Sequence, residues 1–98
     1  MAVDRLRVLV EHFIRELHLQ KTGQPTPAAY DRATTGQLLK LFRTIPDTTP
    51  DEFAKLRDTV DFADPAHHSE VGYAVPSGTA IRPHIDRIHG LMQRHGLL

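Results

Sequence analysis

The chain contains no cysteine, which excludes disulfides, thiolate metal sites and cysteine nucleophiles. It also lacks tryptophan and has only two tyrosines and four phenylalanines, too few to stack on many nucleic-acid bases. No apolar run approaches the ~18 residues that cross a membrane, and the first residues lack the basic-then-apolar order of a signal peptide. Because small secreted domains usually depend on disulfides, we expect a cytoplasmic protein without membrane contact.

The chain also has no surplus charge, since twelve basic residues balance twelve acidic ones. This balance argues against a strong nucleic-acid binder, which needs excess Lys and Arg for phosphate contacts. A local basic face that contacts RNA remains an option, because basic residues recur along the first predicted helix, although acidic neighbours dilute them. These residues are Arg5, Arg7, Arg15 and Lys21.

The pattern that is present is helical. Apolar residues at a 3-4-3-4 spacing predict an amphipathic helix over residues 3–20, where Glu11 and Arg15 stand at the i,i+4 spacing of an ion pair. A break at Gly23 and two prolines ends this helix. In the next segment, TPAAYDRA, we expect a helical turn with Thr26 as its cap. The stripe of the first helix consists of Val3, Leu6, Val10, Phe13 and Leu17.

Two further helices have capping signals. Thr34, with Gln37 three residues later, predicts a capping box for a helix over residues 36–44. Thr49, followed by Pro50 at the first helical position and Glu52 at the third, marks the clearest helix start in the chain. This third helix should end before the Asp-Pro pair at residues 64–65.

The last predicted helix covers residues 80–94, with a stripe that includes Ile81, Ile85 and Ile88. Because proline is tolerated only in the first turn of a helix, we expect the regular helix to begin close to Pro83. Residues 64–79 read as irregular. The sequence therefore predicts an all-α fold, a small four-helix bundle-like domain that spans residues 1–98 as a single unit.

Histidines are frequent near the C-terminus, where His84 and His89 flank the last apolar stripe and His95 extends it. Such rings usually pack their carbon atoms at the border of the core and keep a nitrogen in water. Zinc binding is the alternative, but His84 and His89 are not at the i,i+4 spacing of a helical metal site. We therefore predict no metal and no cofactor. The other residues of that zinc alternative are His67, His68 and Glu70.

The segment LRDTVDFADPAHHSE, residues 56–70, places Arg57 late in the third helix and presents His67 and His68 after a helix-breaking proline. It resembles the motif of HEPN-type helical domains, in which an arginine and a polar residue precede a histidine. Many members of that family are metal-independent ribonucleases of toxin–antitoxin and phage-defence systems, and others serve in binding. The resemblance implies that Arg57 holds a phosphate while His67 or His68 moves a proton.

A second arginine–histidine pair, Arg82 and His89, shares one face of the last helix, although Pro83 replaces the polar residue of the motif. Arg57 also has a simpler interpretation, an i,i+4 pair with Asp61 on the helix surface. The near-heptad stripes and the lack of a compelling active site lead us to expect a helical protein-interaction or assembly module. Its expected partner is a second copy or a larger, defence-type protein, and the alternative is a HEPN-like ribonuclease.

Overall fold

The computed structural model describes residues 2–63 and 78–98. This part of the chain consists of helices without any strand, so the all-α prediction is confirmed. The four α-helices are α1 (Ala2–Thr22), α2 (Thr35–Phe42), α3 (Pro50–Ala63) and α4 (Gly78–Arg94), and a short 3-10 helix, η1 (Ala28–Tyr30), lies between α1 and α2.

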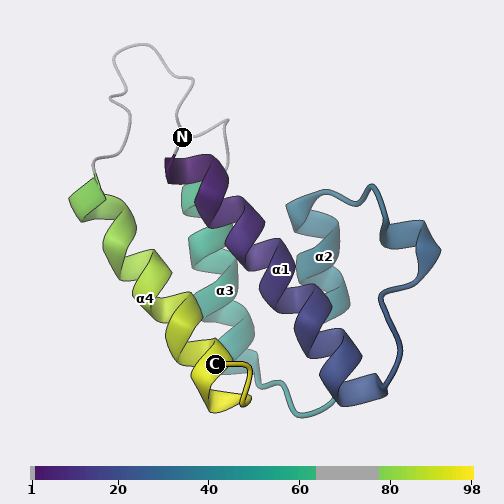
Figure 1. Ribbon diagram of the computed structural model, residues 1–98. Helices are drawn as coiled ribbons and strands as arrows, with labels where there is room; N and C mark the ends of the chain where they lie inside the picture. Colours follow the sequence, from purple (N-terminus) through teal and green to yellow (C-terminus); the bar gives the residue numbers. More distant parts are fainter. Residues whose placement is uncertain (1, 64–77) are drawn as a thin grey trace.

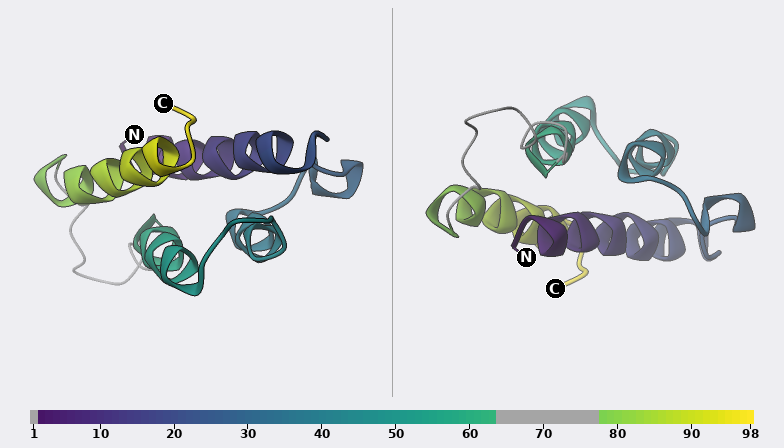
Figure 2. Two further views of the ribbon diagram at one scale, coloured as in Figure 1. Left: turned by 90° about the horizontal axis from the view of Figure 1, so that it is seen from below. Right: turned by 90° about the horizontal axis from the view of Figure 1, so that it is seen from above.

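The helices form two layers, with α1 and α4 in one and α2 and α3 in the other (Figure 2). The long α1 packs against all three other α-helices, so the first and last helices of the chain lie side by side (Figure 1). An amphipathic helix must bury its apolar stripe against neighbours, and α1 has neighbours on two sides of that stripe.

The core forms where these stripes meet. Phe13 and Phe42 are fully buried, with ring centroids 6.0 Å apart, and they join α1 to α2. Leu56 of α3 and Ile88 of α4 are also fully buried and close the core from the other side. The described residues of the stripes predicted for the first and last helices thus pack into this core. Further fully buried apolar residues are Leu6, Val10, Ile14, Leu17 and Leu38.

Both predicted capping boxes are present. The Thr34 hydroxyl accepts from the Gln37 N–H at 3.2 Å, and the Gln37 side chain accepts from the Thr34 N–H at 2.8 Å. Thr49 and Glu52 exchange the same two bonds at 3.1 and 3.0 Å. Each box satisfies N–H groups that a helix start would otherwise leave open, which explains why α2 and α3 begin where they do.

Two predicted details are wrong. Thr26 does not cap η1, whose N-cap is Pro27, because the Thr26 hydroxyl instead accepts from Arg15 at 2.8 Å. The last helix begins at Gly78 rather than near Pro83, so residues 78–79, expected to be irregular, are helical. Pro83, the sixth residue of α4, lies beyond the first turn and cannot bond to the carbonyl of residue 79, yet the helix continues through it.

Candidate functional site

Arg57 lies on the exposed side of α3, where 66% of its side chain is accessible. Its Nε is 4.0 Å from Asp61 Oδ2, which confirms the i,i+4 pair on the helix surface. Its predicted partners, His67 and His68, lie outside the described residues, as does Glu70 of the zinc alternative. Among the described residues, Arg57 shares surface hollows with the carboxylates of Asp58 and Asp61 and with a second arginine.

That second arginine is Arg7 of α1. Arg7 and Arg57 line the same hollow of about 340 Å³, together with Asp61 and with Gly36 at the start of α2. Leu39 and Val60 also line it and provide apolar surface. The hollow thus combines two guanidinium groups, one carboxylate and an apolar part.

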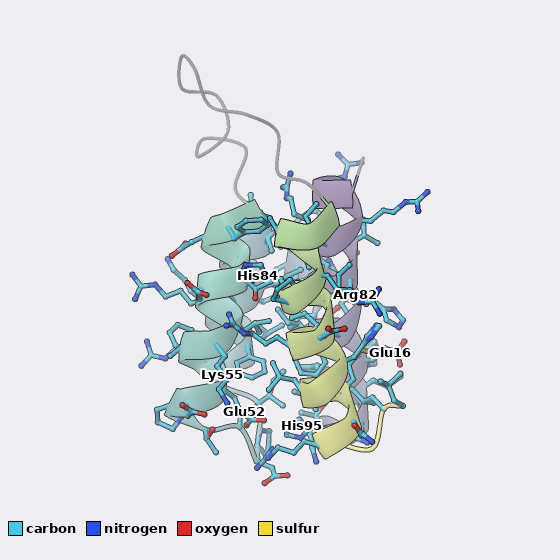
Figure 3. All side chains as sticks on the ribbon, turned by 90° about the vertical axis from the view of Figure 1, so that its left-hand side faces the viewer. Glu16, Glu52, Lys55, Arg82, His84 and His95 are labelled. Carbon is cyan, nitrogen blue, oxygen red and sulfur yellow. The ribbon has the colours of Figure 1, made fainter. Side chains whose placement is uncertain are left out.

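The second arginine–histidine pair predicted from the sequence, Arg82 and His89, does not line this hollow. Arg82 and His89 are both exposed on α4, and Arg82 Nε is 3.2 Å from Asp86 Oδ1. Arg82 projects from α4 on the side away from α3 (Figure 3). It forms an ordinary surface ion pair of the kind that contributes little to stability.

The most buried polar cluster joins α3 to the end of α4 and was not predicted as a unit. The side chains of Glu52 and His95 are 5% and 0% exposed, and His95 Nε2 lies 2.8 Å from Glu52 Oε2 (Figure 3). A carboxylate only accepts, so this hydrogen bond requires the His95 tautomer with its proton on Nε2. Arg94 Nη1 donates to the same oxygen at 2.9 Å and also lies 2.8 Å from His95 Nε2. The expectation that His95 keeps a nitrogen in water is therefore wrong.

The surroundings of this cluster come from the loop before α3 and from α1. Asp47 Oδ2 is 3.9 Å from His95 Nδ1 and 3.1 Å from Lys21 Nζ. The hydrogen bond and charge of Lys21, with smaller contributions from Arg94 and His95, lower the pKa of the exposed Asp47 carboxyl against a small effect of burial. Gln20 donates to the His95 carbonyl at 2.6 Å. Four segments of the chain are thus joined at one end of the bundle.

A second polar contact lies between α3 and α4 near their other end. Thr59 Oγ1 is 2.9 Å from His84 Nδ1, and the His84 ring stacks on Phe62 with centroids 4.2 Å apart. Arg87 donates to Asp58 at 2.8 Å beside them. Burial first, and Arg87 second, lower the pKa of His84, while Asp58 opposes the shift.

A hydroxyl bonded to an imidazole has the geometry of a nucleophile and its base. Thr59 is nevertheless 0% exposed, so no substrate can reach its hydroxyl. The pair therefore satisfies two polar groups at the α3–α4 contact, and His84 takes the predicted place at the core border.

The predicted basic face of α1 is not continuous. Arg15 points toward η1, where it donates to Thr26 and to the Tyr30 carbonyl, each at 2.8 Å. Lys21 is engaged by Asp47. Only Arg5 and Arg7 of the predicted set show no hydrogen bond or ion pair within the described residues, and nothing unites the four into one patch for RNA.

The outer side of α1 carries the largest exposed apolar side chains of the described helices. Val8 is 63% and Leu19 is 45% exposed. Eleven residues separate them, which is about three helical turns, so they project from the same side of α1. His12, which lies between them, is exposed as well.

Within residues 2–63 and 78–98, no three His, Asp or Glu side chains are placed to hold a metal ion. No described helix is both long and apolar enough to cross a membrane. Comparison of the chain with family models, with curated proteins and with solved structures finds no match.

Proposed function

We propose that this chain is a helical protein-interaction module that assembles with a second copy or with a larger protein through the outer side of α1. The observation that supports the proposal is the exposure of Val8 and Leu19 on one side of the longest helix. Since the described stripe residues of α1 and α4 pack into the core, these two are the large apolar side chains that the described part of α1 leaves exposed to a partner. The absence of cysteine favours a cytoplasmic setting.

The test is a photo-crosslinking side chain placed at position 8 in the expressing cell, combined with mass measurement of the purified protein over a range of concentrations. We expect crosslinks at position 8 that are lost with Leu19→Asp. Position 98 is the matched control, because Leu98 is also apolar and 69% exposed but lies outside α1. Equal crosslinking at positions 8 and 98 would contradict the proposal.

The resemblance to HEPN-type domains extends this proposal to an accessory domain of a defence-type system, and it supplies the second candidate, a metal-independent ribonuclease. The exposure of Arg57 beside Arg7 favours that candidate, because phosphate-binding arginines must be accessible. The test is incubation with total RNA and chelator. Cleavage that survives both Arg57→Ala and His67→Ala would exclude this assignment.

A further inference from the structure

The hollow between α1, α2 and α3 is lined by an arginine, Arg7, that has no partner in the part of the chain that the structure describes. Arg7 is half-buried and has no hydrogen bond or ion pair within residues 2–63 and 78–98. A guanidinium group that has lost part of its hydration is stabilised by an anion that accepts two of its N–H groups. Among the described residues, Asp61 lines the same hollow, and Glu11, four positions after Arg7 on α1, accepts from the Thr35 hydroxyl at 3.0 Å.

Arg57 lines the same hollow from α3. Its one ion pair there, with Asp61, is 4.0 Å long between side chains that are 66% and 59% exposed. Exposed pairs of this kind are weak, so Arg57 can exchange Asp61 for a stronger acceptor at little cost. Two guanidinium groups from different helices are thus available to one ligand.

The start of α2 adds donors to this pair of arginines. The Thr34 cap accounts for the N–H groups of Gln37 and Leu38. The N–H groups of Thr35 and Gly36 have no acceptor inside the helix, as in every first turn. A Cβ built at Gly36 would meet only the Thr34 hydroxyl at 3.9 Å, so the backbone there is open to a ligand. These amides supplement the arginines, which are the basis of the site.

We propose that Arg7 and Arg57 bind a phosphate group in this hollow. Phosphate oxygens match the fork of N–H donors on each guanidinium, and a doubly charged phosphate monoester outcompetes Asp61 for them. Leu39 and Val60 would contact the organic part of such a ligand. The proposal shares Arg57 with the ribonuclease candidate but needs neither His67 nor the outer side of α1, so phosphate binding can hold where RNA cleavage or assembly fails.

The test is a titration of the ¹⁵N-labelled chain with inorganic phosphate at constant ionic strength, followed at the amide signals of Thr35 and Gly36. We expect saturable shifts that Arg7→Gln and Arg57→Gln each weaken about tenfold or more, the effect of losing a charged hydrogen bond. Arg82→Gln is the matched control, because Arg82 also forms an exposed i,i+4 pair with an aspartate.

Asp61→Asn provides a test that misfolding cannot imitate. Because this change removes the competing carboxylate, we expect tighter phosphate binding, by several-fold. A short RNA without terminal phosphates is titrated in parallel, which distinguishes binding of a phosphodiester backbone from binding of free phosphate. Binding of either ligand supports the site if it depends on both Arg7 and Arg57. Shifts that do not saturate, or that persist in both arginine variants, would overturn the proposal.

Discussion

The buried carboxylate of Glu52 permits a quantitative test of what joins α3 to the end of α4. Glu52→Ala removes the acceptor of three groups, the Thr49 N–H, the Arg94 guanidinium and His95 Nε2. Thr49 and Arg94 are exposed enough to recover much of their hydration, whereas the fully buried His95 cannot, and the group nearest to its Nε2 is then another donor, Arg94 Nη1 at 2.8 Å. An orphaned buried donor costs ~1–3 kcal/mol and a lost cap bond ~1 kcal/mol, so we expect a total of about 3 kcal/mol.

The measurement is urea unfolding followed by circular dichroism at 222 nm. With a urea slope of about 1.5 kcal/mol/M, the midpoint should fall by about 2 M while the slope stays constant. Asp51→Ala is the matched control, because Asp51 is also in the first turn of α3 but is exposed and paired only with Lys55. Its loss should cost less than about 1 kcal/mol.

Glu52→Gln separates the cap of α3, which Glu52 forms with Thr49, from the contact of Glu52 with Arg94 and His95 at the end of α4. The amide oxygen can still accept from the Thr49 N–H, but an NH₂ group then faces the donors of Arg94 and His95. We therefore expect an intermediate loss of about 2 kcal/mol. If Glu52→Ala costs no more than Asp51→Ala, the buried cluster does not hold α4 to α3 and the reasoning is refuted.

Two further predictions concern stability. The folded chain holds the pKa of His84 below its usual value of 6.5, so the unfolded chain takes up this proton first as the pH falls. The stability that His84 contributes is then present above about pH 6.5 and is lost as the pH falls through the folded pKa. In urea unfolding between pH 8 and 4.5, the advantage of the wild-type chain over His84→Gln should shrink toward low pH, and a constant difference would contradict this. Thr34→Ala should cost about 1 kcal/mol, because it opens the capping box of α2, and equal unfolding midpoints would show that the box contributes nothing.

The helix starts were predictable because their causes are local. A cap such as Thr34 or Thr49 bonds to a backbone group three residues away, so the whole interaction is visible in a short stretch of sequence. The buried faces of α1 and α4 were predictable for the related reason that an apolar stripe has a fixed helical spacing. The fold class followed from these two signals.

The hydrogen-bond partners of the polar side chains of α1 were not predictable from the sequence, because they depend on how α1 packs against other segments of the chain. The i,i+4 spacing of Glu11 and Arg15 predicts an ion pair, yet Glu11 accepts from Thr35 and Arg15 donates to Thr26 and the Tyr30 carbonyl. These partners come from segments beyond the end of α1. A helix surface offers a long side chain both local and distant partners of similar strength, and tertiary packing decides between them.

The same limit applies to the candidate sites. The resemblance to HEPN-type domains implies that Arg57 binds a phosphate, but Arg7, which lines the same hollow, is on another helix and was assigned to a different, basic face. His95 was recognised as an extension of an apolar stripe, whereas its carboxylate partner, Glu52, is 43 residues away. The signal that would have linked them is the position of Glu52 in a capping box, which points one carboxylate oxygen away from the cap.

The side-by-side placement of α1 and α4 has a consequence for how the chain folds during its synthesis. The ribosome releases α1 first, but one side of its apolar stripe is covered only after α4 has emerged. The contact between Gln20 and the His95 carbonyl can form only after the 75 residues that follow Gln20 have been synthesised. Until then the nascent chain exposes core residues of α1, so we expect chaperones to bind ribosome-attached chains that lack α4.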